Sequence, residues 1–354
     1  MNSFSSTSPD RKQVGYAVDP RFLDHRNPSG HPECPQRLES IMAMLDQLEG
    51  RDRLQQVFGE RVPRDLATQV HSHELVQALS ESMGQPYTRF DADTYACSDS
   101  FEVARLATGH GVELTRRVVA GTLGVGFALI RPPGHHAETN RIMGFCLLNN
   151  VAIAAQAALQ EASVERVAIV DFDVHHGNGT QEIFYSRSDV LYISAHQHPL
   201  YPGTGALQES GRDQGLGFTV NFPLPAGLGN PTYNSLFLDL VCPLVEAFEP
   251  QLILVSAGYD AHAQDPLASM NVSEEGFGLM TRQLNRVAGR ACEGKIVYFL
   301  EGGYNLEALA GSVSATLRET LSPGSDRSDL DNSDFYRNYR DQAVTRLNTW
   351  WPSL

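Results

Sequence analysis

The chain has 354 residues, of which 42% are hydrophobic and 19% are charged. This size and composition allow one large globular domain with a sizeable core, or two small domains. Acidic side chains outnumber basic ones by 42 to 27, which gives a formal net charge of −15. A nucleic-acid partner is therefore not expected, because binding to phosphates needs a supply of Lys and Arg.

Cysteine usage and the N-terminal sequence indicate the compartment. The five cysteines are scattered and form no CxxC pair, which is typical of reduced thiols in a cytosolic protein. The first residues lack the basic and apolar regions of a signal peptide, and no run of eighteen apolar residues predicts a membrane span. We therefore expect a cytoplasmic protein without a membrane partner.

In chain order, the Ser-rich residues 1–12 predict a disordered N-terminus, and residues 19–37 predict a long ordered loop. Apolar periodicity predicts helices over 35–48 and 100–120. Short apolar strands then alternate with helices. The expected strands are 124–130, 167–172, 190–194, 252–256 and 296–300, and the expected helices lie near 149–162, 232–248 and 273–292.

Strands that are apolar throughout and are separated by helices predict a parallel sheet covered on both faces. The expected fold is therefore α/β, a three-layer sandwich with a central, mainly parallel sheet flanked by helices. The sequence contains no convincing interior linker, so we expect one domain over residues 13–321. Residues 322–354 then form a tether and a C-terminal helix, with Trp350 and Trp351 packed on the same domain.

Dense polar clusters follow four of the predicted strands. They are PPGHHAETN (132–140), DFDVHHGNG (171–179), AGYDAHAQDPL (257–267) and EGGYN (301–305). Ligands of open α/β sheets bind at the carboxyl ends of the strands. The four clusters are therefore expected to meet at one edge of the sheet.

The second and third clusters suggest a metal site. Asp173 and His175 are two residues apart at a strand end, so their side chains point the same way, and Asp260 follows another strand. Three protein ligands with an open fourth position are typical of catalytic Zn²⁺, and this oxygen-rich set also suits Fe²⁺. Each Asp alone could instead cap a helix, but the combination favours a metal.

His135 and His136 are adjacent and cannot both face one point, so they are expected to have separate roles. One of them can act as a general base and then protonate a leaving amine. Asp171 and Asn178 are well placed to hold the other ring nitrogens. The second histidine of the metal motif, His176, is expected to be structural.

Tyr304 follows two glycines, Gly302 and Gly303, which let the backbone approach closely. Its hydroxyl could then reach a substrate carbonyl and stabilise an oxyanion. The alternative is an interfacial core tyrosine whose hydroxyl lies in solvent.

With these residues assembled, the chain resembles the histone deacetylase family, whose fold is the arginase/deacetylase fold, and within it the class II type and bacterial deacetylase-like amidohydrolases. The resemblance runs from about residue 16 to residue 315, and Asn178 and the EGGYN motif are class II features. The motifs that carry it are HPECPQRL (31–38), RPPGHHA (131–137), GFCLLNN (144–150), DFDVHHGNG, YPGTG (201–205), AGYD (257–260) and EGGYN.

The resemblance implies a zinc-dependent deacetylase in which His136 is the main general base and acid. His135 would be its electrostatic partner, oriented by Asp171, and Asn178 would lie behind His136. Tyr304 would stabilise the oxyanion. The zinc ligands implied are Asp173, His175 and Asp260, and a structural K⁺ is implied near Asp171, Asp173, His175 and Ser194.

The resemblance also implies a tunnel for an acetyl-lysine or similar acylated amine. Phe145 and Tyr201 would form its walls, Gly134 would lie beneath it, and Asp93 would grip the substrate backbone at the rim. Hydroxamates would then be expected to inhibit.

Three alternatives stay open. An acetylpolyamine deacetylase would suit the acidic charge, although Leu267 stands where a polyamine-selective relative carries Glu. A binuclear manganese ureohydrolase of the same fold would need further Asp or His ligands. A non-catalytic acyl-lysine-binding scaffold would be a decayed enzyme, yet every catalytic position is filled. The substrate, the acyl length and a homo-oligomeric state stay undetermined.

Overall fold

The computed structural model describes residues 13–324 and 330–352, so the predicted disordered segment 1–12 lies outside the described residues. Its centre is an eight-stranded sheet in the order β2-β1-β5-β10-β9-β6-β7-β8, and each neighbouring pair is parallel. The strands are β1 (Val14–Ala17), β2 (Leu54–Gln56), β5 (Val125–Ala128), β6 (Val167–Asp171), β7 (Val190–Gln197), β8 (Thr219–Leu224), β9 (Leu252–Ala257) and β10 (Ile296–Leu300).

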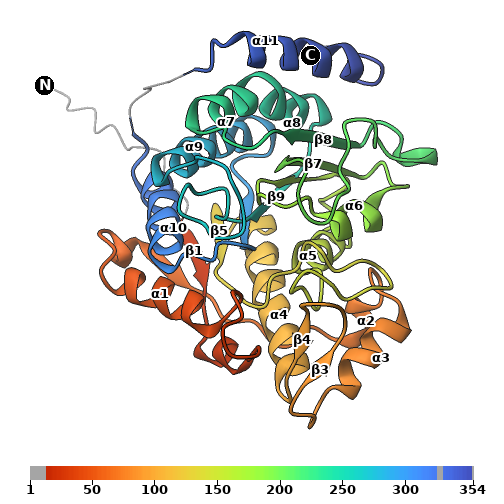
Figure 1. The fold of residues 1–354 in the computed structure, drawn as a ribbon, viewed down its shortest axis with the longest axis vertical. Helices are drawn as coiled ribbons and strands as arrows, with labels where there is room; N and C mark the ends of the chain where they lie inside the picture. The colour runs from red at the N-terminus through yellow and green to blue at the C-terminus, as the bar shows by residue number, and fades with distance from the viewer. Residues whose placement is uncertain (1–12, 325–329, 353–354) are drawn as a thin grey trace, which may run out of the picture.

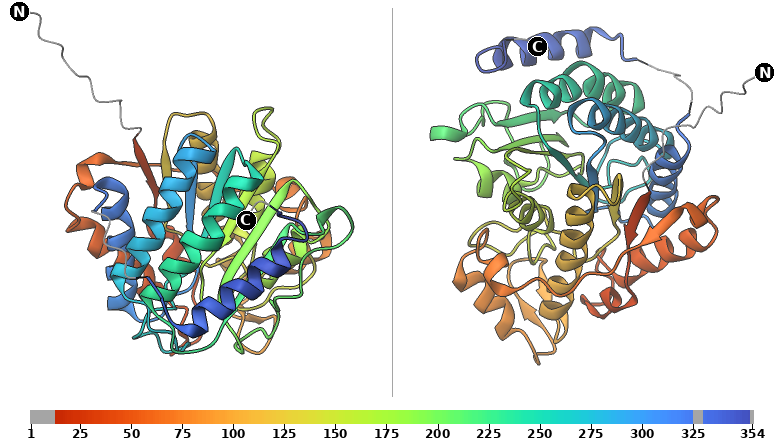
Figure 2. Two further views of the ribbon diagram at one scale, coloured as in Figure 1. Left: turned by 90° about the horizontal axis from the view of Figure 1, so that it is seen from above. Right: turned by 180° about the vertical axis from the view of Figure 1, so that it is seen from behind.

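Helices cover both faces of this sheet (Figures 1 and 2), which confirms the predicted three-layer α/β sandwich. One face carries α1 (Pro35–Asp46), α7 (Asn230–Leu236), α8 (Cys242–Phe248), α9 (Glu274–Ala291) and α10 (Leu306–Leu321). The other face carries α4 (Ser100–Val119) and α5 (Asn150–Ala158). Smaller elements are α2 (Arg64–Ala67), α3 (His73–Glu81), α6 (Asn178–Phe184) and the hairpin of β3 (Thr88–Arg89) and β4 (Tyr95–Ala96).

The central strands are buried along their whole length, because helices lie on both sides of them. All five predicted strands are present, with ends that differ by at most a few residues. The helix predicted near 232–248 is present as α7 and α8, which a π-helical turn, Phe237–Val241, joins into one helical stretch. All five cysteines are free thiols.

The C-terminal helix α11 (Asp334–Leu347) lies outermost, against the segment of α7 and α8 (Figure 1). Beyond it, Trp351 packs edge-on against Phe218 and Phe248, and its indole nitrogen donates to the Gly217 carbonyl at 2.9 Å. Within residues 13–324 and 330–352, no helix is both long and apolar enough to cross a membrane.

Helix α4 lies directly on the loop after β2, and a glycine makes this possible. A Cβ atom on Gly109 would lie 1.7 Å from the Glu60 carbonyl oxygen. We expect Gly109→Ala to lower the free energy of unfolding by about 2 kcal/mol or more, because backbone cannot move aside cheaply. The denaturation midpoints of the variant and the wild type measure this loss of stability.

The matched control for this substitution is Gly289→Ala in α9, where no atom lies within 4 Å of the added carbon. It should be neutral or stabilise the protein by about 0.5–1 kcal/mol, since Ala favours a helix over Gly. Equal effects of the two substitutions would contradict the close contact at Gly109.

Candidate functional site

The carboxyl ends of four strands meet at one edge of the sheet. The register places Asp171 at the end of β6 opposite Ser194 of β7 and Ser256 of β9. In the same way, Leu300 of β10 lies opposite Ala257 of β9. The polar loops that follow β5, β6, β9 and β10 therefore converge, as the sequence predicts.

Asp173, His175 and Asp260 form a buried group whose potential ligand atoms all lie within 4.8 Å of one another. The His175 Nδ1 atom is 3.2 Å from Asp173 Oδ1 and 3.1 Å from Asp260 Oδ2. Burial alone would lower the pKa of His175, but its hydrogen bonds to the two carboxylates raise that pKa to about 10. The space between these three side chains therefore favours positive charge. Its two oxygen donors and one nitrogen donor fit a divalent cation.

Glycines and backbone amides hold the two carboxylates in place. The Gly302 amide donates to Asp173 Oδ2 at 2.8 Å, and the Val174 amide donates to Asp260 Oδ1 at 2.9 Å. A Cβ atom on Gly302 would lie 2.0 Å from Asp260 Oδ2. Gly302 therefore lies behind the ligand group, and any side chain there would displace it.

The two adjacent histidines have different partners. His135 Nδ1 lies 3.1 Å from Asp171 Oδ2, and His136 Nδ1 lies 2.7 Å from Asn178 Oδ1. The Asn178 amide nitrogen donates to Glu138 at 2.6 Å, which leaves its oxygen to accept from His136. The proton of neutral His136 is therefore on Nδ1, and the Nε2 atom keeps a free lone pair.

The charges of the two rings differ as well. Burial, together with the neighbouring His135 and His175, holds the pKa of His136 well below its usual value. Burial would also lower the pKa of His135, but the carboxylates of Asp173 and Asp171 raise it to about 10. The site thus pairs a neutral imidazole, which can take up a proton, with a cationic one.

A pocket of about 210 Å³ opens onto the metal group of Asp173, His175 and Asp260 and onto His136. Seven of the predicted site residues line it, from the metal group to the rim. The lining consists of Asp93, His136, Gly144, Phe145, His175, Leu200, Tyr201, Leu267 and Tyr304. Gly134 and Gly303 do not line it: the Gly134 amide donates to Glu301, and the Gly303 carbonyl accepts from Arg37.

Tyr304 lies at this pocket with its hydroxyl protonated. Burial raises the pKa of Tyr304 well above its usual value, and the nearby Arg37 guanidinium opposes that shift. The Arg37 guanidinium carbon lies 4.8 Å from the centre of the Tyr304 ring, and the Tyr304 amide donates to Asp265 at 2.7 Å. A phenol that keeps its proton can donate a hydrogen bond into the pocket.

Glu301 and Asp265, two acids that were not predicted as site residues, hold the site together. Glu301 Oε2 accepts from the amides of Gly134 at 2.6 Å and His135 at 3.1 Å. Asp265 accepts from the amides of Tyr304 and Leu267. Glu301 lies directly after an apolar strand and before two glycines, and this position was the sequence feature that could have indicated a role at the site.

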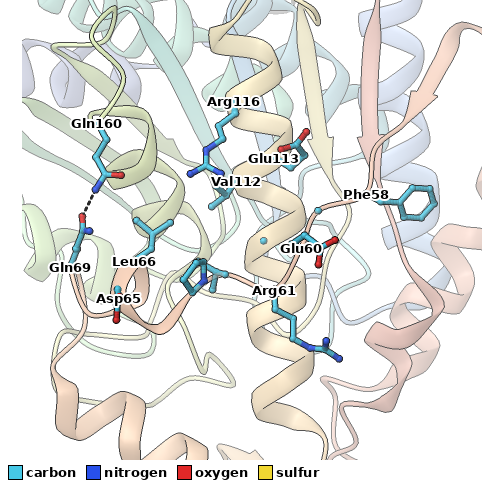
Figure 3. Close-up of a pocket in the computed structure, with 14 residues that line it drawn as sticks. Phe58, Glu60, Arg61, Asp65, Leu66, Gln69, Val112, Glu113, Arg116 and Gln160 are labelled. Atoms are coloured by element: carbon cyan, nitrogen blue, oxygen red, sulfur yellow. Dashed lines mark hydrogen bonds between the residues drawn. The ribbon is translucent and has the colours of Figure 1, made fainter.

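Two other features of the described residues do not form a second site of the same kind. His135, Cys146 and Glu301 also lie within 4.8 Å of one another, but Glu301 already accepts three hydrogen bonds. A larger cavity of about 660 Å³ lies beside α4 (Figure 3). Its lining mixes Arg116, Glu113 and Leu66 and includes no member of the metal group.

The chain is similar to known proteins over most of its length. A family profile described as the histone deacetylase domain matches residues 31–320. Histone deacetylase 14, chloroplastic, of Arabidopsis thaliana is 39% identical over a 324-residue alignment that covers 86% of this chain and 76% of that protein. Histone deacetylase 10, chloroplastic, of Oryza sativa subsp. japonica is 41% identical over a 313-residue alignment that covers 83% of this chain and 70% of that protein.

The crystal structure of the HDA15 HD domain has the same fold, with a TM-score of 0.90 at 38% identity. The match covers 96% of this chain and 97% of that one, so the predicted deacetylase fold is confirmed. Since the domain profile also spans most of the sequence, the chain belongs to the histone deacetylase family.

Proposed function

We propose that the protein is a zinc-dependent deacetylase that hydrolyses the acyl-amide bond of N-acetyl-lysine-type substrates. The observation that carries this proposal is the convergence of Asp173, His175 and Asp260 with His136 and Tyr304 around one narrow pocket. The relatives named above are deacetylases by name, which supports the reaction class.

Asp173, His175 and Asp260 would hold the metal, and Zn²⁺ is the ion that best suits this donor set. When bound, it would supply Lewis acidity to an amide carbonyl and lower the pKa of water from about 15.7 towards roughly 7. Fe²⁺ would suit the same oxygen-rich donors.

His136 would act as the general base. Its Nε2 lone pair is free because Nδ1 donates to Asn178, and its low pKa keeps the ring neutral until it removes a proton from the attacking water. The same ring would then give that proton to the departing amine. The cationic His135, held by Asp171, would stabilise the negative charge that develops nearby.

Tyr304 would donate its hydroxyl hydrogen bond to the carbonyl oxygen as that oxygen becomes an oxyanion. Phe145 and Tyr201 would flank the linear acyl-lysine chain, with Leu267 and Asp93 at the pocket. A structural K⁺ is also proposed, since Asp171 and Ser194 lie opposite each other in the sheet, close to the metal group.

A panel of acylated amines tests the proposal. Zinc-loaded protein should hydrolyse an acetyl-lysine peptide, and a hydroxamate should inhibit it because it competes for the metal and the pocket. The panel should vary both the acyl chain and the amine. Absence of any hydrolysis at full zinc loading would favour the non-catalytic scaffold instead.

A second candidate is an acetylpolyamine deacetylase, which the rim acids favour. Asp91 and Asp93 lie together beside Tyr201, and this negative potential would attract a cationic amine. In contrast, Leu267 adds no negative charge to the same pocket, which counts against a polyamine substrate. A strong preference for N-acetylspermidine over the peptide would select this candidate.

A further inference from the structure

A closed ring of hydrogen bonds fixes the loop that follows β7. The Thr204 hydroxyl lies 2.8 Å from His176 Nδ1, and His176 Nε2 lies 2.9 Å from Gln181 Oε1. Gln181 Nε2 donates to Glu209 Oε2 at 2.5 Å. Glu209 in turn accepts from the Gly205 amide at 3.1 Å, which returns the ring to the residue after Thr204.

The direction of each bond in this ring is determined. Asn221 Nδ2 also donates to Gln181 Oε1 at 2.7 Å, so this atom must be the amide oxygen. His176 therefore carries its proton on Nε2 and accepts from the Thr204 hydroxyl at Nδ1. Within the ring itself, every donor faces an acceptor.

The loop lies directly on the imidazoles because residue 205 is glycine. Gly205 has a φ of +85°, and a Cβ atom there would lie 2.5 Å from His196 Nε2 and 2.6 Å from His176 Cδ2. His176 is 1% exposed and Gln181 is 8% exposed. His176 and Gln181 therefore form the buried side of the ring, whereas Thr204 is exposed and Glu209 is partly buried.

The same loop contains Tyr201, which lines the pocket beside the metal group. The Tyr201 ring lies edge-on to His136, with 5.2 Å between ring centres, and edge-on to His175 at 6.3 Å. Tyr201 itself is 40% exposed, so its position depends on the loop more than on burial. His176 directly follows His175, so the ring ties this wall to the segment that carries the metal group.

We propose that Gln181 and Glu209 are positioning residues that set the place of Tyr201 in the substrate pocket, an inference that rests on the proposed function. Neither residue lines the pocket, so they act through the ring. Breaking the ring should weaken substrate binding and leave the chemical step intact, because His136 and Tyr304 are held by other contacts.

Three variants test this proposal. Gln181→Leu removes both bonds that Gln181 makes, and Glu209→Gln sets one amide nitrogen against another. Each should raise KM for an acetyl-lysine peptide by roughly tenfold, with kcat and zinc content unchanged. The double variant Gln181→Glu with Glu209→Gln again pairs a donor with an acceptor at each of the four ring bonds and loses only the second contact of the Gly205 amide, with Glu209 Oε2 at 3.2 Å. It should return KM close to the wild-type value.

Gln283→Leu is the matched control, since Gln283 is a buried glutamine of α9 that donates to Asn234 at 3.3 Å. It should leave KM unchanged. A fall in kcat at constant KM for Gln181→Leu, or no rescue in the double variant, would overturn the proposal.

Amide hydrogen exchange at Gly205 and Ala206 provides a readout that does not depend on turnover. Glu209 accepts from both amides, so their exchange should accelerate in Gln181→Leu and in Glu209→Gln and slow again in the double variant. Unchanged exchange rates at these two amides would contradict the claim that the ring holds the loop. Absence of hydrolysis by the wild type would instead overturn the proposed function, and the ring would be judged by exchange alone.

Discussion

Tyr304→Phe is expected to lower kcat by roughly 10²–10³, because it removes one hydrogen-bond donor to the developing oxyanion. The phenyl ring itself should stay in place, since Arg37 lies over it and Phe145 packs edge-on against it. Zinc content should also stay unchanged, because Tyr304 is not one of the three metal-group residues. Steady-state kinetics and metal analysis of the same preparation measure both effects.

Tyr298→Phe is the matched control for this experiment. Tyr298 is a buried tyrosine of β10 whose hydroxyl donates to Asn285 at 2.9 Å, away from the pocket. Removing that hydroxyl should leave kcat unchanged. If Tyr304→Phe kept near-wild-type kcat, the proposed oxyanion role would be wrong.

Glu33→Gln is expected to lower the free energy of unfolding by about 3–5 kcal/mol, because it leaves buried positive charge uncompensated. Glu33 accepts two hydrogen bonds from Arg131, at 2.7 and 2.8 Å, and one from Arg37 at 3.2 Å. All three side chains are fully buried. Denaturation midpoints of variant and wild type give the difference.

Asp46→Asn provides the comparison for an exposed ion pair. Asp46 pairs with Arg51, and both side chains are largely in solvent, so its loss should change stability by less than about 1 kcal/mol. If the two substitutions cost the same, burial would not be the reason for the effect at Glu33.

The effect of Glu33 should also depend on pH. Burial alone would raise its pKa, but Arg131 and His25 hold that pKa well below the ordinary value of 4.5. A lowered acid pKa contributes stability that is full above 4.5 and is lost as the pH falls towards the folded-state pKa. The stability difference between wild type and Glu33→Gln should therefore shrink below pH 4.5. A difference that stays constant there would contradict this linkage.

The sequence predicted the strands that are buried on both faces and missed the short or marginal ones. β6, β9 and β10 read as continuous apolar runs because helices cover both sides. β2 is only three residues long, and β1, with four residues, is as short as β5, which was predicted because its apolar run continues through Ile130. β8 contains Pro223, which is tolerated because β8 is an edge strand, a position that only the sheet order reveals.

At the candidate site, residue spacing was sufficient to predict which side chains lie together where polar residues directly follow a strand. The structure brings Asp173, His175 and Asp260 together and sets His135 and His136 against Asp171 and Asn178, as the sequence had suggested. These contacts place the predicted side chains together, and their catalytic roles stay a prediction.

The supporting charges were not predictable in the same way. Arg37, Arg131 and Glu33 are charged side chains of types that are mostly exposed, and only their mutual contacts explain why they are buried here. Arg37 also donates to the Glu301 and Gly303 carbonyls, which are far away in sequence. Such pairings depend on the folded backbone, so no local pattern could indicate them.

The most direct test of the central claim is a metal titration of chelator-treated protein, with hydrolysis of an acetyl-lysine peptide followed at each step. The three-residue metal group predicts that activity rises in proportion to added Zn²⁺ and saturates at one ion per chain. Asp260→Ala should then neither retain the ion nor gain activity. Saturation at two ions per chain, or full activity of Asp260→Ala, would contradict a single-metal deacetylase.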